Sequence, residues 1–190
     1  MGATVLYMSM SVDGFITGPN VGPDNGLGDG GERLHEWVFA EDPGSVNREV
    51  MVEFMQTGAV IAGRATFEPA EGWGGDHHDG VPIYILSRHA KPDWAADWPL
   101  VQYRDDLGEI VAEAKAAAGD RNVMVHGSSI AQRMIRADLL DEMQIHVIPV
   151  LLGDGVSLFG HLGLPLRELE LVRAVAGEGG IVHLRYRVIR

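Results

Sequence analysis

The sequence contains no cysteine, and this absence excludes several classes of protein. Without thiols the chain has no disulfide framework, no thiolate metal site and no cysteine nucleophile. The N-terminus lacks a basic segment followed by an apolar one, so no signal peptide is visible. No apolar run approaches the length of a membrane-spanning helix. We therefore expect a cytoplasmic protein with no membrane partner.

Positive charge is also scarce, because 15 lysines and arginines face 27 acidic residues and the formal net charge is −12. This balance argues against nucleic acid as a partner, although a phosphorylated cofactor in a locally basic pocket remains compatible with it. Apolar residues, in contrast, make up 46% of the 190 residues. With no visible repeat or linker, the sequence predicts a single domain over residues 1–190.

The most informative stretch is residues 58–68, where a short β-branched run ends at Gly63 and the chain restarts at Arg64 and Thr66. A strand that breaks at glycine into a helix start directs free backbone N–H groups outward, and these groups attract phosphate. The guanidinium of Arg64 and the hydroxyl of Thr66 would add to that attraction. A plain strand–turn–helix connection is the alternative interpretation, with Gly63 present for its backbone freedom.

Two further strand ends carry polar groups of the same kind. The predicted strand 81–86 runs into Ser87 and Arg88, at the carboxyl end where open α/β sheets bind ligands. The predicted strand 122–126 runs into Gly127, Ser128 and Ser129, which open a helix with one of the serines as N-cap. This junction is a second candidate anion site.

Taken in order, the chain alternates strands with helices and then ends in strands alone. Helices are predicted over residues 45–56, with Ser45 as N-cap, over 107–118, and from about 128 to 135. Strands are predicted over residues 5–12, 58–62, 81–86, 100–103, 122–126, 143–152, 169–176 and 181–189. Pro149 lies within one of these strands and indicates an edge position or a bend. The fold class is therefore α/β, with a mostly parallel central sheet, flanking helices and antiparallel strands at the C-terminal edge.

Three other segments allow more than one interpretation. The loop over residues 18–31, rich in glycine, is interpreted as a lid over a pocket, with a mobile insertion as the alternative. Trp37 and Phe39 are expected in the core, although they could instead cap a pocket. His77 and His78 are expected to be solvated, because no third ligand stands at a spacing typical of a metal site. No metal is therefore expected.

Several of these motifs together resemble the dihydrofolate reductase fold. They are the segments at 11–16, 63–68 and 86–88. A longer run over residues 139–159 is similar to the reductase domain of the bifunctional riboflavin-biosynthesis deaminase–reductases and to their stand-alone bacterial relatives. The resemblance spans nearly the whole chain.

The resemblance implies that the chain binds NADPH. The pyrophosphate would lie at Ala62, Gly63, Arg64 and Thr66. The adenosine 2′-phosphate would be held by Ser87 and Arg88. The second glycine-rich turn would be His126, Gly127, Ser128 and Ser129, with His126 where the family usually has glycine.

The resemblance also indicates the substrate side. Asp13 would lie beside the nicotinamide and pass a proton through water, or it would simply cap the turn before Gly14. Asn47 lies near the position of the carboxylate that holds the pterin in dihydrofolate reductases, so dihydrofolate should be a poor substrate. Phe15 replaces the lysine of the riboflavin reductases, which weakens the case for a ribose phosphate. A heterocycle under Phe15 and Trp37 fits better.

These expectations favour an NADPH-dependent reductase that transfers hydride to a C=N or C=O bond of a small pteridine- or pyrimidine-like heterocycle. One alternative is the riboflavin-pathway 5-amino-6-(5-phosphoribosylamino)uracil reductase. A protein that binds NADPH or a drug without turnover is another. We also expect a homodimer formed through the C-terminal strands, because the apolar run 145–152 is long for an uncovered edge.

Overall fold

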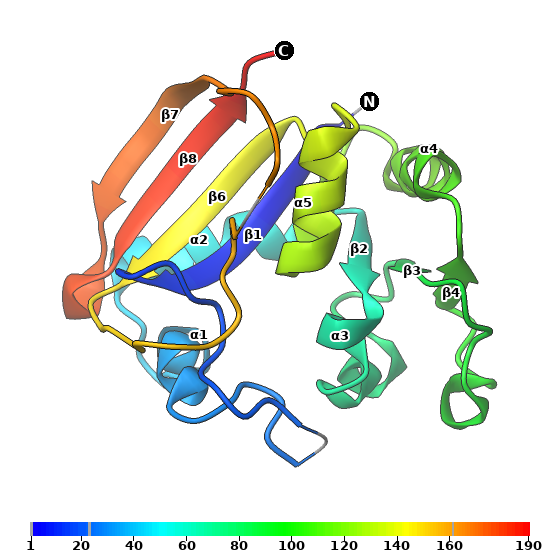
Figure 1. The fold of residues 1–190 in the computed structure, drawn as a ribbon, viewed down its shortest axis with the longest axis horizontal. Helices are drawn as coiled ribbons and strands as arrows, with labels where there is room; N and C mark the ends of the chain where they lie inside the picture. The colour runs from blue at the N-terminus through cyan, green and yellow to red at the C-terminus, as the bar shows by residue number, and fades with distance from the viewer. Residues whose placement is uncertain (1, 23, 161) are drawn as a thin grey trace.

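The computed structural model describes residues 2–22, 24–160 and 162–190, which form an α/β fold around one eight-stranded sheet (Figure 1). The strands are β1 (Thr4–Ser11), β2 (Ala59–Gly63), β3 (Ile83–Leu86), β4 (Val101–Arg104), β5 (Val123–His126), β6 (Glu142–Ile148), β7 (Leu169–Ala176) and β8 (Val182–Val188). The α-helices are α1 (Glu36–Phe39), α2 (Ser45–Met55), α3 (Arg64–Phe67), α4 (Leu107–Ala118) and α5 (Ser128–Arg136). Short 3₁₀ turns are η1 (Gly31–Leu34), η2 (Glu71–Gly75), η3 (Asp93–Ala95) and η4 (Glu178–Gly180).

The sheet confirms the predicted mixture of parallel and antiparallel pairing. Its strand order is β4-β3-β2-β5-β1-β6-β8-β7. The first six strands in that order pair in parallel, and β8 and β7 add to them as an antiparallel hairpin. Figure 1 shows this hairpin at one end of the sheet and β3 and β4 at the other. All the parallel strands therefore present their carboxyl ends at the same edge.

Helices cover both faces of the sheet, and the side chains of β1 show how. Leu6 and Met8 join the core beneath α4 and α5, whereas Val5 and Tyr7 join the core on the side of α2 and α3. This alternation is the two-residue period of a strand that is buried on both faces. In Figure 1, α5 lies in front of β1 and α2 behind it. No helix in the described part of the chain is both long and apolar enough to cross a membrane.

The strand that contains the apolar run ends earlier than predicted. β6 stops at Ile148, directly before Pro149, because proline has no N–H to donate to the next rung of the ladder. The predicted bend at Pro149 is confirmed, whereas the alternative, an edge position, is wrong because β6 lies between β1 and β8. Ile145 is only 4% exposed, so the part of the apolar run that lies in β6 is not an uncovered edge, whereas Leu151, beyond the strand, is 74% exposed. The edge strands are β4 and β7.

The loop over residues 18–31 is tied together internally in its described part. The Gly18 amide donates to the Leu27 carbonyl at 2.8 Å, and the Asp29 amide donates to the Pro19 carbonyl at 2.8 Å. The Asn20 side chain donates to the Asp29 carboxylate at 2.7 Å. These bonds give the loop a defined shape, and its action as a lid stays a prediction.

The start of α2 is capped from a distant part of the chain. Gly44, not Ser45, is the N-cap residue, and Ser45 begins the helix. The Glu178 carboxylate, in the turn between β7 and β8, accepts from the amides of Val46 and Asn47 at 3.3 and 3.1 Å. At Gly44, with φ +84°, a Cβ atom would lie 2.2 Å from the Glu178 side chain, so glycine leaves room for this cap. The expected serine cap is also absent at α5, whose N-cap is Gly127 without a side-chain hydrogen bond.

We expect Glu178→Gln to lower the melting temperature at neutral pH, because a neutral amide caps a helix more weakly than a carboxylate. Hydrogen bonds from backbone amides, that of Asn47 first, lower the pKa of Glu178 from 4.5 to about 2. A lowered folded-state pKa means that the stabilisation is present above pH 4.5 and is lost as the pH falls towards 2. The difference between variant and wild type, measured by thermal melting, should therefore shrink over that range.

Glu168→Gln is the matched control, because Glu168 is exposed and its side chain caps no helix. A Glu178→Gln protein that melts with wild type at pH 7 would contradict the cap.

Candidate cofactor and substrate sites

The two glycine junctions predicted from sequence lie side by side. β2 and β5 pair in parallel up to Ala62 and His126, so Gly63 and Gly127 leave the sheet next to each other. A Cβ atom on Gly127, where φ is +105°, would lie 2.1 Å from the Thr66 Oγ1 atom. A Cβ atom on Gly63 would lie 2.9 Å from the Ser129 Oγ atom. Gly127 is required here by both its positive φ and its contact with Thr66, whereas at Gly63, where φ is −94°, an added Cβ atom would displace only the Ser129 hydroxyl.

A cleft of about 190 Å³ opens in front of these junctions. It collects residues that sequence reasoning proposed separately, and it adds three that lie outside the proposed motifs, Asp105, Ile130 and Arg133. Its lining consists of Gly63, Arg64, Ala65, Leu86, Ser87, Arg88, Asp105, Ser129, Ile130 and Arg133. We call this the cationic cleft, because three guanidinium groups and one carboxylate line it. The other predicted cofactor-binding residues lie at the two junctions without lining the cleft: Ala62, Thr66, His126, Gly127 and Ser128.

The three arginines differ in how they are held. Arg64 forms a two-pronged ion pair with Glu68, with Nε and Nη2 at 2.7 and 3.0 Å from the carboxylate oxygens. The hydrogen bond from Arg64 lowers the pKa of Glu68, so this pair stays charged at neutral pH. Within the described residues, Arg88 and Arg133 have no ion-pair partner. Their charge is available to an anion in the cleft.

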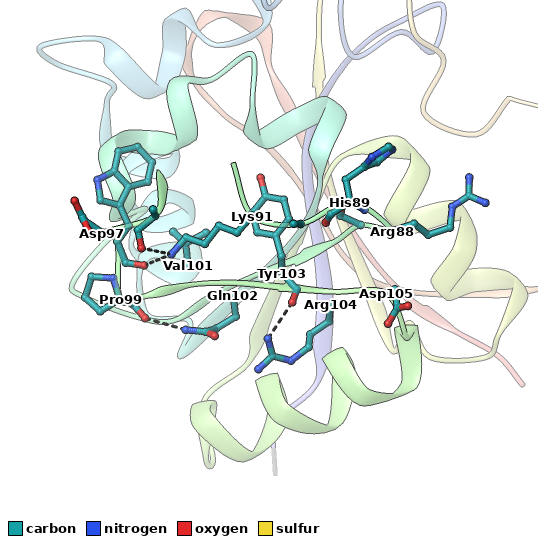
Figure 2. A pocket seen from close by; sticks show the side chains of 14 residues that line it. Arg88, His89, Lys91, Asp97, Pro99, Val101, Gln102, Tyr103, Arg104 and Asp105 are labelled. Atoms are coloured by element: carbon teal, nitrogen blue, oxygen red, sulfur yellow. Dashed lines mark hydrogen bonds between the residues drawn. The ribbon is translucent and has the colours of Figure 1, made fainter. Parts of the chain in front are cut away.

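A larger cleft of about 590 Å³ adjoins the cationic cleft (Figure 2). The two clefts share Ser87, Arg88 and Asp105, and the larger one continues past Trp98 and Tyr103 along the edge of β4. In Figure 2 the Arg88 side chain lies at the end of the pocket opposite Asp97. An anion bound at Arg88 would therefore have room beside it for an attached ring.

Ser87 shapes the turn that presents Arg88. Its hydroxyl donates to the His89 carbonyl and accepts from the His89 amide, both at 2.9 Å. The Ser87 amide donates to the Arg104 carbonyl at 2.7 Å. The Ser87 hydroxyl is thus committed to its own turn, and its contact with a phosphate stays a prediction.

Asp13 connects two loops at the carboxyl edge of the sheet. Its carboxylate accepts from the amides of Leu152 and Gly153 at 3.2 and 2.7 Å. The Ser11 hydroxyl and these amides hold the pKa of Asp13 below its ordinary value. These two contacts join the turn after β1 to the loop after β6, and the alternative in which Asp13 caps the turn before Gly14 stays open. The role of Asp13 in proton transfer stays a prediction. In that role the Asp13 carboxylate would be ionised and would act through a water molecule.

Trp37 and Asn47 meet in a buried polar cluster on the α2 side of the sheet. Trp37 is 5% exposed, which confirms its core position, and its Nε1 donates to the Ser9 hydroxyl at 3.0 Å. Asn47 Oδ1 lies 2.8 Å from His183 Nε2, and His183 Nδ1 lies 2.8 Å from His146 Nδ1. Sequence reasoning missed both histidines. A single imidazole inside each of two apolar strands was the available signal.

Phe39 and Phe15 are the other aromatic residues that were predicted to lie in the core or at the site. The core position expected for Phe39 is wrong, because its side chain is 80% exposed. It ends α1, a helix of four residues that buries only Trp37. Phe15 lies in the turn after β1, where its backbone forms a bridge with Ser157. Its contact with a substrate stays a prediction.

The histidines of the loop after α3 are not solvated, contrary to expectation. His78 is 5% exposed and hydrogen-bonds the Thr57 side chain at 3.1 Å, and His77 packs against the Trp73 ring at 4.6 Å. Backbone with positive φ at Trp73 and its neighbouring glycines folds this loop inward. Burial lowers the pKa of His77 to about 3 and that of His126 to about 4. Among the residues described, no three or more His, Asp or Glu side chains are arranged to hold a metal ion.

The fold and the paired glycine junctions define the class: an α/β protein with the dihydrofolate reductase-like fold and a cationic cleft at the carboxyl edge of its sheet. The RibD C-terminal domain family matches residues 4–183, and the chain belongs to this family. The uncharacterized protein YwjB of Bacillus subtilis is 27% identical over 161 residues, which cover 84% of this chain and 83% of that protein.

Solved structures show the same fold at lower identity. A protein of Shewanella sp. PV-4 that is provisionally assigned to riboflavin biosynthesis is 22% identical, with a TM-score of 0.74 and coverage of 99% of both chains. A pyrimidine reductase-like protein of Corynebacterium diphtheriae is 14% identical, with a TM-score of 0.68, and the match covers 100% of this chain and 92% of that one. The deaminase/5-amino-6-(5-phosphoribosylamino)uracil reductase of Thermotoga maritima is 12% identical, with a TM-score of 0.61, and the match covers 99% of this chain and 57% of that one.

The cationic cleft predicts that Arg133→Ala weakens the binding of adenosine 2′,5′-bisphosphate by at least roughly tenfold, because a hydrogen bond to a charged group is lost. Calorimetric titration would measure this change, and the loss should lessen at high salt. Arg48→Ala is the matched control, since Arg48 lies on α2, outside the lining of the cleft, and forms an ion pair with Asp42 at 3.1 Å. Equal affinities for the two variants would remove Arg133 from the site.

Proposed function

We propose that this chain is an NADPH-dependent reductase that transfers hydride to a C=N or C=O bond of a small pteridine- or pyrimidine-like heterocycle. The observation that carries the proposal is the cationic cleft, in which Arg64, Arg88 and Arg133 meet two strand ends closed by Gly63 and Gly127. Membership of the RibD C-terminal domain family supports an oxidoreductase. A cytoplasmic location belongs to the same proposal.

The residues present fit a dinucleotide phosphate. Because neither Gly63 nor Gly127 carries a side chain, the backbone can approach a pyrophosphate closely at both junctions. Arg64, held by Glu68, would pair with the pyrophosphate. Arg88 and Arg133 would hold the 2′-phosphate, and the larger cleft would receive the adenine.

When bound, NADPH supplies the hydride, and the chain contributes position and electrostatics. The adenosine end would be fixed at the cationic cleft, which leaves the nicotinamide to follow the glycine junctions towards His126 and the end of β1. The buried face around Trp37 and Asn47 would exclude water from the reacting ring. The substrate carbon would accept the hydride, and its nitrogen or oxygen would accept a proton from a water held near Asp13.

One alternative substrate follows from the relatives. The Thermotoga maritima protein carries the name of a 5-amino-6-(5-phosphoribosylamino)uracil reductase, so the same reaction is a second candidate for this chain. Phe15 stands where the resemblance leads us to expect a lysine, and it offers no charge to a ribose phosphate. We therefore favour a heterocycle that lacks this phosphate. Steady oxidation of NADPH with any such ring would exclude a protein that only binds the cofactor.

We expect Arg88→Ala to weaken NADPH binding by roughly tenfold or more and to leave NADH binding within about twofold, because only NADPH carries the 2′-phosphate. Titration of intrinsic tryptophan fluorescence with each cofactor would measure both affinities. Arg48→Ala serves again as the control outside the cleft. Equal losses for the two cofactors would show that Arg88 does not read the 2′-phosphate.

Dihydrofolate should be reduced slowly or not at all, because Asn47 offers an amide where a carboxylate would be needed to protonate the pterin. Loss of NADPH absorbance in the presence of dihydrofolate is the measurement. Turnover in the usual enzyme range, about 1–10³ per second, would place the acid elsewhere.

We also propose that the chain forms a homodimer through β7. This strand has an unpaired edge, and the side chains of Leu169, Leu171 and Val172 are 42%, 55% and 43% exposed. A long apolar edge of this kind is usually covered. The support thus comes from β7, because the first half of the run, residues 145–148, lies in the interior strand β6.

Light scattering at micromolar concentration should therefore give twice the chain mass of 20.6 kDa. Leu171→Lys should shift the protein towards the monomer, because a charge would be buried at the contact. Gln102→Lys, on the opposite edge strand β4, is the control and should leave the mass unchanged. A monomeric wild type would rule out the dimer.

A further inference from the structure

The interface between α2 and the sheet is polar where a helix–sheet contact is normally apolar. Ser9, His146 and His183 lie in one cross-strand row on β1, β6 and β8. The three residues are 5%, 3% and 0% exposed. The Trp37 ring covers this row, with its centroid 4.8 Å from that of His146 and 5.3 Å from that of His183. A buried row of this kind needs a hydrogen-bond partner for every polar atom.

The hydrogen bonds determine which nitrogen of each imidazole carries a proton. Asn47 Nδ2 donates to the Glu178 carbonyl at 3.4 Å, which fixes the orientation of the amide, so Asn47 Oδ1 must face His183. Asn47 Oδ1 can only accept, and His183 Nε2, 2.8 Å away, must therefore be the donor. In a neutral imidazole the other nitrogen is then bare, so His183 Nδ1 accepts from His146 Nδ1 at 2.8 Å.

Both imidazoles are held in the neutral form. Burial, with Arg173 nearby, lowers the pKa of His183 to about 4. Burial, together with the neighbouring His183, holds the pKa of His146 well below its ordinary value. With its proton on Nδ1, His146 must carry a bare lone pair on Nε2. Among the described residues, this buried atom has no hydrogen-bond partner.

Two further imidazole nitrogens on this side of the sheet are buried without a partner, His35 Nδ1 and His126 Nδ1. His146 interacts electrostatically with both of these rings, so they lie in the same region. His126 ends β5 and directly precedes the Gly127 junction. The His126 ring thus lies next to the Gly127 junction, and its electrostatic interaction with His146 connects that junction to the polar row. A bare imidazole nitrogen can only accept a hydrogen bond, so the partner that fits His146 Nε2 is a donor.

We propose that His146 Nε2 accepts a hydrogen bond from an N–H group of the ligand, so that the site selects amino-substituted pyrimidine-like rings over rings that offer only acceptors. This assignment rests on the proposed function, which places the substrate on the α2 side of the sheet. His183 and Asn47 are positioning residues, because they fix the tautomer that leaves Nε2 bare. Trp37 is the side chain that such a ring contacts, and its short segment, η1 and α1, must shift to admit it.

The test uses two probes of similar shape, 2,4-diaminopyrimidine, which offers donors, and 2,4-dimethoxypyrimidine, which does not. Calorimetric titration of the full chain without cofactor should show that the diamino compound binds roughly tenfold more tightly. His146→Phe keeps the ring but removes the acceptor, and should reduce the preference to within about twofold. His146→Gln retains an acceptor oxygen and should keep part of the preference for the diamino compound. His78→Gln is the control, because His78 is a buried imidazole bonded to Thr57, and this variant should keep the full preference.

A second measurement tests the positioning residues. Nitrogen-15 chemical shifts of the histidines should show protons on His146 Nδ1 and His183 Nε2 in wild type, and a mixture of His146 tautomers in Asn47→Leu. A merely structural role for Asn47 would leave the tautomer unchanged.

Equal binding of the two probes by wild type, a full preference in His146→Phe, or a proton on His146 Nε2 would each overturn the assignment. If thermal melting shows that His146→Phe does not fold, the probe preference of wild type is compared with that of His146→Gln, which should be smaller. Adenosine 2′,5′-bisphosphate affinity should be the same in all His146 variants. If the protein prefers the diamino probe but does not bind NADPH, the proposed reductase is refuted and the role of His146 Nε2 as an acceptor is kept. If it binds NADPH but shows no preference between the probes, the role of His146 Nε2 is refuted and the proposed reductase is kept.

Discussion

The parallel pairing of β2 with β5 is the constraint on which the site depends. Because Ala62 lies opposite His126, β2 and β5 leave the sheet at the same level. Gly63 then lies against the Ser129 side chain, and Gly127 lies against the Thr66 side chain. A side chain at Gly127 would collide with Thr66 and push α3 and α5 apart. The arginines of the cationic cleft would then no longer converge, since Arg64 begins α3 and Arg133 lies on α5.

A second set of contacts joins the C-terminal hairpin to α2 and makes it part of the site. The turn between β7 and β8 supplies Glu178 as the cap, and β8 supplies His183 as the partner of Asn47. Farther along the helix, Glu53 forms an ion pair with Arg173 on β7. The hairpin thus fixes the position of the helix that covers the polar row, and any pairing of β7 with a second chain would act on the same contacts.

Local patterns predicted much of this arrangement and missed the parts that depend on distant residues. The alternation of strands and helices, the helix over 107–118 and both glycine junctions are found as predicted. Of the two alternatives for the strand with Pro149, the bend is found and the edge position was wrong, because proline shows only where a ladder must stop and not which strands flank it. Ser45 was wrong as a cap, because a carboxylate 133 residues away reaches its helix.

The sequence by itself determined the class of fold and the glycine junctions, because periodicity and backbone freedom are properties of neighbouring residues. It also showed that cations follow strand ends in an otherwise acidic chain. Only the tertiary structure decided that Arg133 joins Arg64 and Arg88, that His78 is buried, and that His146 keeps a bare nitrogen. These features depend on strand order and cross-strand register, which bring together residues far apart in the chain, and no local pattern encodes which of them will meet.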